Sequence, residues 1–417
     1  MFPIVRIPET IQRRFFSDVG LRSLFSKPQW EHFREVVLAL ILAVGRRTIK
    51  TQALGLATGT ARTSLGDFYT QSPVDTEQVL MYLCRRHLIQ LKAKRGDKIQ
   101  IIIDDSHARK RGKKIEAAGK YFDAALRTFL YGHNFIAAVV RVGNRVVPFD
   151  VRLAYKKVWA KKLNLPFRTL NDLAVLLIEA FAPIVQEMEL DVQVLFDSFY
   201  MNKKVVGAVM AQGWTYVSVL ASNRTFKIKG RKTNIGDYRR CIPYEQYRKL
   251  WCATEEGKKA YWATSRRAYL PKIGEVKIVF SKRHPDQKAL PLVTNAVGLS
   301  TKDIVELYRR RWAIEVHFFK AAKQLLGLAE YQTGKAEGIQ KHLRLVACAY
   351  SLLAVETLGW ENDAEKTETK RRGFRLREAR DRIRGEVFED LLDFLEASED
   401  PKGAIRELRK LLRAGAA

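Results

Sequence analysis

Cysteine is scarce in this sequence, and its placement does not fit a metal or disulfide site. Four cysteines occur in 417 residues, and no two of them form a Cys-x-x-Cys pair. Only His87, three residues after Cys84, comes near the spacing of zinc ligands, and no second such pair lies close by in the chain. The sequence therefore argues against a structural zinc site and against a disulfide framework, and it favours a reducing compartment.

Signals for export and for membrane insertion are equally lacking. The first residues, Met-Phe-Pro-Ile-Val-Arg-Ile-Pro-Glu, have neither the basic start nor the apolar run of a signal peptide. The longest apolar run, residues 36–44, is far shorter than the roughly 20 residues that span a bilayer. We therefore expect a cytoplasmic protein that does not contact membranes.

Acidic residues are few relative to basic ones. The chain has 45 Asp and Glu against 74 Lys and Arg, which gives a formal net charge of +29. Such an excess destabilises a compact fold by self-repulsion unless a polyanion such as a nucleic acid neutralises it. Hydrophobic residues make up 47% of the chain, so a disordered or collagen-like protein is excluded. We expect a folded nucleic-acid-binding protein. The alternatives are a basic protein kept soluble by its charge and a membrane-surface protein.

The first part of the chain has the pattern of a helical domain, which we expect to bind DNA. Apolar residues indicate helices near 30–44 and near 75–93. Between them a helix from Thr48, a turn at Gly59 and a second helix over 61–69 would form a helix-turn-helix. The basic residues placed to contact phosphates are Arg46, Arg47, Lys50 and Arg62. An ordinary corner of a helical bundle explains the same residues equally well.

From residue 98 the pattern changes from helices to strands. The expected order is strand, hairpin, helix, strand, helix and strand, which is the succession of an RNase H-like α/β core with a mixed sheet flanked by helices. A stretch rich in Lys, Arg, Tyr and Trp then predicts an inserted β subdomain, after which helices resume. The expected regions are a helical DNA-binding domain (1–95), a first core part (96–221), the β subdomain (222–299), a second core part (300–360) and a basic helical C-terminal region (361–417).

Three acids stand out in this arrangement: Asp105, Asp197 and Glu315. The first two close predicted strands, and ligands of open α/β sheets bind at the carboxyl ends of strands. Three carboxylates would bind two Mg²⁺ or Mn²⁺ ions about 3.5–4 Å apart for phosphodiester chemistry. Asp104 and Asp105 cannot both face one site, because successive strand residues point to opposite faces. Alternation alone does not choose between them, because both faces of this strand are apolar.

The helix that carries Glu315 also carries basic and aromatic residues. Tyr308 and Arg311 lie within about 20° and 40° of Glu315 around an α-helix, so the three share one face. Arg can bind a phosphate bidentately and Tyr can hydrogen-bond to it, which suits a phosphate next to a metal. The alternative is an amphipathic helix with an internal ion pair.

Residues 99–345 resemble the DDE transposases of bacterial insertion sequences, in the group with a Tyr-Arg-Glu-Lys signature. The matching pieces are Ile-Asp104-Asp105-Ser106, Leu195-Phe196-Asp197-Ser198, Leu292-Val-Thr-Asn and Tyr308-x2-Arg311-Trp312-x-Ile-Glu315. The resemblance implies an RNase H-like catalytic domain with a β insertion between the second and third acids. It also implies that the first catalytic Asp immediately precedes a Ser or Thr, which selects Asp105.

One position departs from the signature. Its lysine normally follows the glutamate by seven residues, where this sequence has Ala322 followed by Lys323. On an α-helix Lys323 lies about 80° from Glu315, although its long side chain makes up part of that offset. We assign Lys323 as a phosphate contact.

The resemblance further implies a partner and a reaction. The expected protein binds the terminal inverted repeats of a transposon, cleaves there with two Mg²⁺ ions, or Mn²⁺ as a substitute, and joins the ends to target DNA. A homodimer on double-stranded DNA in the bacterial cytoplasm or nucleoid is expected, because two ends are processed together. Trp251 or Trp262 could stack on a flipped base, although such residues are more often part of a core. The alternatives are a metal nuclease without strand transfer and a non-catalytic DNA-binding protein derived from a transposase.

Overall fold

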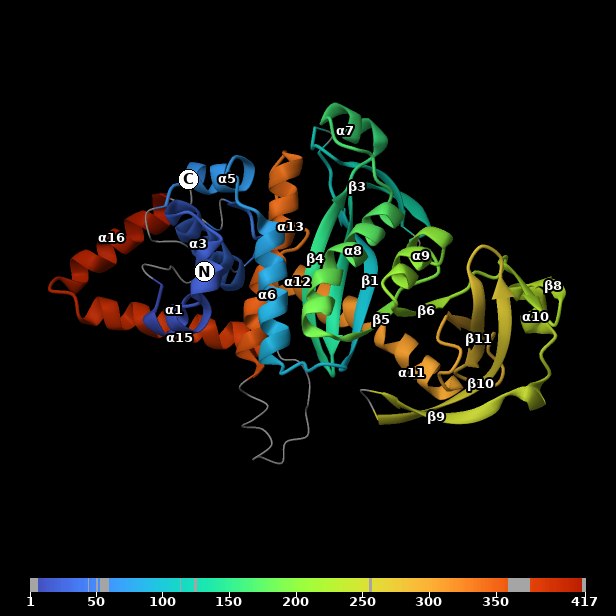
Figure 1. Cartoon of the computed structure of the whole chain (residues 1–417). Helices are drawn as coiled ribbons and strands as arrows, with labels where there is room; N and C mark the ends of the chain where they lie inside the picture. Colours follow the sequence, from blue (N-terminus) through green and yellow to red (C-terminus); the bar gives the residue numbers. More distant parts are fainter. Residues whose placement is uncertain are drawn as a thin grey trace.

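The computed structural model describes residues 7–43, 45–49, 52, 60–112, 114–123, 126–254, 257–358 and 376–414. Helices gather at one end of the molecule, a mixed sheet with flanking helices forms the middle, and the strands β7 to β11 form the other end (Figure 1). Within the described residues, no helix is both long and apolar enough to cross a bilayer.

The N-terminal part is helical, as the sequence predicts. Its described helices are α1 (Glu9–Phe16), α2 (Val19–Ser23), α3 (Lys27–Leu42), α5 (Arg62–Thr70) and α6 (Thr76–Gln90). The side chain of Asp75 accepts hydrogen bonds from the backbone N–H groups of Glu77 and Gln78, so it caps α6. Helix α5 corresponds to the second helix of the predicted helix-turn-helix. Most of the predicted first helix and its turn, residues 53–59, lie outside the described residues.

The strands of the described residues form one twelve-stranded sheet of RNase H-like α/β type, which confirms the predicted fold class. Strand β1 pairs in parallel with β5, and β5 with β6, while β1 pairs antiparallel with β3. The strands of the middle part are β1 (Lys98–Arg109), β2 (Gly119–Asp123), β3 (Thr128–Val142), β4 (Arg145–Ala154), β5 (Asp191–Leu195) and β6 (Thr215–Val219). The predicted hairpin is β3 and β4. Strand β2, which pairs with the start of β3, was not predicted.

The segment predicted as a β subdomain is indeed mostly strands. It contains β7 (Thr225–Ile228), β8 (Arg231–Asn234), α10 (Ile235–Arg240), the 3₁₀ turn η1 (Tyr244–Gln246), β9 (Arg248–Thr254), β10 (Gly257–Leu270), β11 (Gly274–Lys282) and β12 (Leu290–Thr294). Strand β12 pairs with both β6 and β11, so hydrogen bonding continues from the central sheet into this segment.

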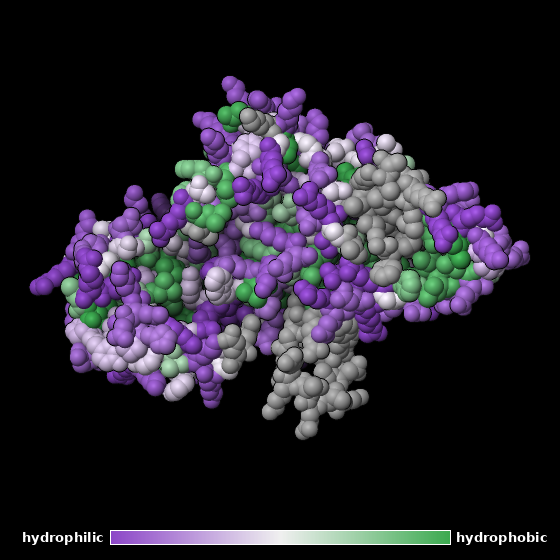
Figure 2. All heavy atoms as spheres, turned by 180° about the vertical axis from the view of Figure 1, so that it is seen from behind, coloured by the Kyte–Doolittle hydropathy of each residue, from purple (hydrophilic) through white to green (hydrophobic). Residues whose placement is uncertain are grey.

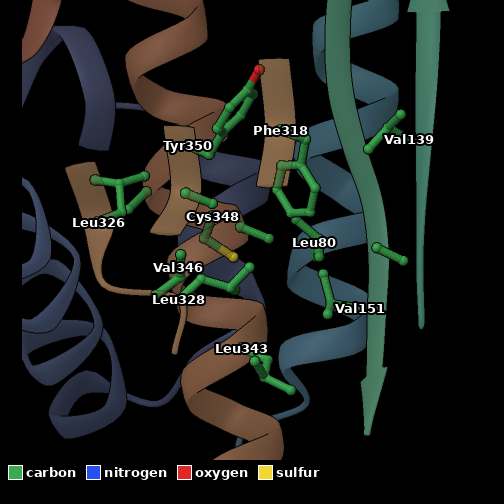
Figure 3. Packing of buried hydrophobic residues seen from close by; sticks show 14 of the residues in the cluster. Leu80, Val139, Val151, Phe318, Leu326, Leu328, Leu343, Val346, Cys348 and Tyr350 are labelled. Carbon is green, nitrogen blue, oxygen red and sulfur yellow. The ribbon is translucent and has the colours of Figure 1, made fainter. Parts of the chain in front are cut away.

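Helices cover both faces of the central strands, which explains why β1 is apolar on both sides. On one face Ile99, Ile101 and Ile103 join the core formed with α8 (Leu170–Met188) and α9 (Lys203–Ala211). On the other, Ile102 joins the core that includes α13 (Ala336–Glu356). Figure 3 shows this second core, where Leu343, Val346, Cys348 and Tyr350 pack with Leu80 and Phe318 beside Val139 and Val151.

The helical pattern expected from Thr301 to Leu326 is divided. The chain forms α11 (Thr301–Arg310), then the π-helical turn η2 (Ile314–Phe319), then α12 (Lys320–Leu326). The C-terminal part adds α15 (Leu376–Glu396) and α16 (Pro401–Ala414), and the short helix α7 (Lys157–Lys162) follows β4. The expectation of one continuous α-helix through Glu315 was therefore wrong.

Candidate active site

Both acids of the Asp104-Asp105 pair lie inside β1. The strand continues to Arg109, and the two acids pair with Ala137 and Ile136 of β3. The prediction that β1 closes on these carboxylates was therefore wrong, because the antiparallel pairing with β3 extends the strand beyond the parallel pairing with β5.

The register between β1 and β5 decides which of the two acids faces Asp197. Ile102 of β1 pairs with Leu195 of β5, so these side chains lie on the same face of the sheet. Asp104 and Asp197 each follow by two residues, and side chains two apart along an extended chain point the same way. A backbone bond from Phe196 N to Val217 O (3.4 Å) and a bond from the Ser218 side-chain hydroxyl to Asp197 O (2.9 Å) hold the chain beside β6 up to this acid. Asp104 and Asp197 therefore share the face that carries η2.

Asp105 points to the opposite face. Its Oδ1 accepts a hydrogen bond of 2.9 Å from the hydroxyl of Tyr200, which is fully buried. Burial raises the pKa of the Asp105 carboxyl, and the bond from Tyr200 opposes that rise. Arg311 and Glu315 therefore meet Asp104 and not Asp105, while the charge of Asp197 also contributes to the raised pKa of Asp105.

Arg311 connects Asp104 to Glu315. One terminal nitrogen of its guanidinium donates to Asp104 Oδ2 at 2.9 Å, and the other lies 2.9 Å from Glu315 Oε1. The Arg311 side chain is only 13% exposed, and its Nε has no hydrogen-bond partner. The geometry confirms that Arg311 and Glu315 lie close together, and it adds Asp104 as a second partner.

The site has an excess of negative charge. Burial raises the pKa of Asp104 to about 7, Arg311 opposes this shift, and the charges of Asp105, Asp197 and Glu315 add to it. The neighbouring acids thus raise the pKa of Asp104 even though the guanidinium of Arg311 lies beside it. Further positive charge is needed to stabilise three ionised carboxylates here.

The donor chemistry of this site fits hard divalent cations. Carboxylate oxygens are the ligands that Mg²⁺ and Mn²⁺ prefer, and Asp104, Asp197 and Glu315 offer only such oxygens. Within the described residues, however, no group of three Asp, Glu, His or Cys side chains is arranged to hold a metal ion. Arg311 lies between Asp104 and Glu315, so metal binding there requires its guanidinium to move.

Lys323 reaches the same face through the π-helical turn. Its ammonium group donates to Ser106 Oγ at 2.7 Å, and Ser106 lies two residues beyond Asp104 on β1. A π-helical turn closes i→i+5 hydrogen bonds and so takes about one residue more than an α-helical turn. The extra residue between Glu315 and Lys323 is absorbed by η2, which explains how an eight-residue spacing still directs the lysine to the Asp104 face of β1.

Tyr308 lies on the same side of the site. The guanidinium of Arg311 is 5.8 Å from its ring centroid. Burial raises the pKa of the Tyr308 hydroxyl, and the charges of Asp197 and Asp104 contribute to the rise. The structure therefore brings Tyr308, Arg311 and Glu315 together with the two aspartates, and Lys323 contacts Ser106 on the same face of β1.

Other predicted DNA contacts lie elsewhere. Arg47 is buried, and its guanidinium donates to the carbonyl oxygens of Ala43, Gly45 and Leu325, so in this conformation it cannot contact phosphate as predicted. Arg46 is exposed, whereas Lys50 lies outside the described residues.

The two predicted stacking tryptophans lie together on β9 and β10. Trp251 is 55% exposed and Trp262 is partly buried, and the Lys249 ammonium lies 5.0 and 5.7 Å from their ring centroids. Trp312 was not among the predicted contacts. Its side chain is 56% exposed, and the guanidinium of the neighbouring Arg311 lies 5.4 Å from its ring. Its position within the Tyr308–Glu315 motif is the feature of the sequence that could have indicated this residue.

Comparison with known protein families agrees with this geometry. A family model described as "Transposase DDE domain" matches residues 173–352, which include Asp197 and Glu315. A second, described as "DDE superfamily endonuclease", matches residues 21–240, more than half of the chain, and includes Asp104 and Asp197. No curated protein matches the chain significantly.

Proposed function

Because this chain belongs to the DDE superfamily endonucleases and carries a transposase DDE domain, we propose that it is a DNA transposase. In this proposal it binds the ends of a bacterial insertion sequence, cleaves the DNA there and joins the freed ends to target DNA. The observation that carries the proposal is the link from Asp104 through Arg311 to Glu315 on the sheet face that Asp197 shares.

We assign the metal-binding role to Asp104, Asp197 and Glu315, with Asp104 in place of the Asp105 that the sequence favoured. These carboxylates would hold two Mg²⁺ ions, or Mn²⁺ as a substitute. When bound, such ions activate the attacking oxygen and stabilise the leaving oxygen of a phosphodiester. In this role the three carboxylates do not donate a proton in the reaction. They act as ionised ligands.

The basic and aromatic residues around the acids position the DNA. Arg311 releases the carboxylates and binds the phosphate next to the scissile bond with the same two terminal nitrogens. Tyr308 and Lys323 contact the same phosphate group or its neighbour, because both side chains lie on this face. Trp251 and Trp262 remain candidates for stacking on an unpaired base.

The partner that fits the charge of +29 is double-stranded DNA, as terminal inverted repeats and as target. Processing two ends together requires two active sites, so we propose a homodimer on DNA. The cytoplasmic or nucleoid location and the division into regions at residues 95, 221, 299 and 360 remain predictions of the sequence.

The test uses a labelled duplex that carries the terminal repeat of the source element, with Mg²⁺ and a plasmid target. The wild-type protein is expected to nick the labelled strand and to join it to the plasmid, and Asp197→Ala is expected to lose both activities. The matched control is Asp191→Ala, because Asp191 is an exposed residue at the other end of β5 and should not affect either step.

The other outcomes decide between the alternatives. Cleavage without joining, even with both ends supplied, would identify a nuclease that does not transfer strands. Salt-sensitive binding without cleavage in Mg²⁺ or Mn²⁺ would identify a non-catalytic DNA-binding protein. Cleavage that survives in Asp197→Ala would refute the proposed site.

A further inference from the structure

Two aromatic side chains are exposed at the end of the β2–β3 hairpin. Phe122 and Phe129 pair directly across the two strands, and their ring centroids lie 5.4 Å apart in an edge-to-face arrangement. Phe122 is 53% exposed, Phe129 is 68% exposed, and the nearby Leu126 is 62% exposed. A cross-strand aromatic pair usually stabilises a hairpin by covering a core. This pair faces solvent, so the fold itself does not account for it.

A strongly basic surface surrounds this pair. Lys120 and Arg127 of the hairpin are exposed. All basic residues of 153–169 are exposed, and that segment contains no acid; these residues are Lys156, Lys157, Lys161, Lys162 and Arg168. The acids of the hairpin are engaged, because Glu116 accepts from Ala336 N at 2.9 Å and Asp123 accepts from Leu126 N at 3.0 Å. At the top of the molecule Figure 2 shows hydrophobic side chains next to hydrophilic ones.

Helix α7 is attached to the hairpin. Trp159 Nε1 donates to Ala118 O at 2.9 Å, and the Lys156 side chain packs against Gly119 at the start of β2. Figure 1 places α7 at the top of the molecule, and the pairing of Ala154 with Asn134 puts the chain that leads into α7 next to the first part of β3. Lys156 packs on the face of the hairpin that carries Gly119, and strand alternation places Phe122 and Phe129 on the other face. The lysines of α7 and the hairpin aromatics thus flank one hairpin, and we name this region the hairpin–α7 surface (residues 114–123, 126–132 and 153–168).

This surface lies beyond the proposed active site along the direction of β1. Asp104 pairs with Ala137 of β3, and Phe129 lies eight residues before Ala137 on the same strand. At about 3.4 Å per residue the separation is roughly 27 Å. A duplex that follows the strand covers this length in about eight base pairs, since successive base pairs rise by about 3.4 Å.

We propose that the hairpin–α7 surface binds duplex DNA on one side of the cleavage site and bends it, with Phe122 and Phe129 inserted at a base-pair step. The proposal rests on the proposed function, because it assumes that DNA occupies the acid site. Proteins that kink DNA insert apolar side chains between base pairs while basic groups hold the flanking phosphates. A protein partner would be expected to bring acids to this surface, whereas DNA matches both the charge and the flat rings.

The test measures the bend directly. The substrate is a mixed-sequence duplex with a donor dye at one end and an acceptor dye at the other. It is much shorter than the DNA persistence length of roughly 150 base pairs. Saturating wild-type full-length protein is expected to raise energy transfer, as a bend of about 20–90° would. Phe122→Ala/Phe129→Ala is expected to bind the same duplex without that rise. Phe388→Ala on α15, which removes another partly exposed phenylalanine, is expected to behave as wild type.

A second variant separates phosphate contact from insertion. Lys157→Gln/Lys161→Gln should lower the slope of log affinity against log salt by about two, because each lysine neutralises one phosphate. At saturation it should still bend the duplex. Melting temperatures of all variants in the absence of DNA should lie close to that of wild type, since every substituted side chain is at least partly exposed.

Each result bears on the inference. Wild-type binding without any bend, or a bend that persists in Phe122→Ala/Phe129→Ala, would overturn the insertion while leaving the proposed transposase intact. A wild-type protein that binds neither this duplex nor the terminal repeat would overturn both proposals. Loss of dimerisation in the phenylalanine variant, with bending unchanged, would instead identify the surface as a contact between two copies of the chain and would refute the DNA assignment.

Discussion

The guanidinium of Arg311 donates a hydrogen bond of 2.9 Å to the carboxylate of Asp104, 207 positions away in the chain. Its second terminal nitrogen lies 2.9 Å from Glu315, four residues later on the next helical turn. The arginine thus neutralises two of the oxygens that a divalent cation would bind. Metal and guanidinium compete for the same carboxylates, whereas a DNA phosphate offers Arg311 an alternative partner.

Arg311→Ala should therefore tighten metal binding and weaken catalysis. We expect Mn²⁺ to bind the DNA-free variant at least about tenfold more tightly, because a hydrogen bond to a charged group contributes roughly 1.5–3 kcal/mol. Electron paramagnetic resonance of free Mn²⁺ measures this affinity. DNA cleavage should fall, since the phosphate loses its bidentate partner. Arg310→Ala is the control, and weaker Mn²⁺ binding in Arg311→Ala would show that the arginine organises the acids instead.

The choice between the adjacent aspartates is testable by metal-dependent stability. Asp104→Asn should abolish the rise in melting temperature that Mn²⁺ causes, whereas Asp105→Asn should retain it. A ligand at 100 times its dissociation constant stabilises the native state by about 2.7 kcal/mol, so the difference is measurable. Asn at position 105 can still accept the Tyr200 hydrogen bond, which protects the fold. The reverse pattern would restore Asp105 as the first acid.

There is a physical reason why the sequence alone could not distinguish Asp104 from Asp105. Ile102 and Ile103 are both fully buried, because helices cover both faces of the central sheet. Polar–apolar alternation therefore carries no information in β1. Only the register with β5, which pairs Ile102 with Leu195, assigns Asp104 to the face of Asp197. The order of helices and strands, by contrast, was predictable, because hydrophobic periodicity and turn residues can be recognised within short stretches of sequence.

Lys323 shows a second limit of sequence reasoning. Its angle relative to Glu315 was calculated on an α-helix, and η2 changes that angle by inserting a wider turn. Periodicity does not reveal a π-helical turn, because the flanking segments remain α-helical. Arg47 shows a third limit. A basic residue in a helical region is expected to be exposed to solvent, whereas the guanidinium of Arg47 is buried and donates to three backbone carbonyl oxygens.

Buried histidines predict loss of stability in mild acid. Burial lowers the pKa of His133 and of His342 to about 4. Their unfolded pKa is about 6.5, so the unfolded state binds more protons and stability falls as the pH drops through 6.5 toward 4. Between pH 7.5 and pH 5 each histidine should cost about 2 kcal/mol of unfolding free energy.

Urea unfolding at several pH values tests this dependence. His342→Gln removes one titrating group, while its amide can still donate to the Gly327 carbonyl that His342 Nε2 contacts at 2.9 Å. The fall in stability between pH 7.5 and pH 5 should be smaller in this variant by about 2 kcal/mol. An unchanged pH dependence would mean that other groups cause the acid sensitivity.

A buried ion network joins the N-terminal helices to the core, and its disruption should be costly. Arg344 of α13 donates to Asp150 of β4 at 2.8 Å, and Arg152 links Asp150 to Glu77 of α6 through bonds of 2.7 Å. The Asp150 side chain is 1% exposed, so loss of one guanidinium leaves a buried carboxylate underneutralised. Breaking a buried pair in this way typically costs 3–5 kcal/mol.

Arg344→Met should accordingly lower the free energy of unfolding by about 3–5 kcal/mol in denaturant titrations. Arg85→Ala breaks an exposed pair with Glu187 and should cost less than about 1 kcal/mol, because solvent screens it. The double variant Arg344→Met/Asp150→Asn should recover part of the loss, since the unpaired charge is gone. If Arg344→Met alone cost no more than Arg85→Ala, Arg152 or hydration by water would be sufficient to stabilise the Asp150 carboxylate. The network would then not be what holds α6 and α13 to β4.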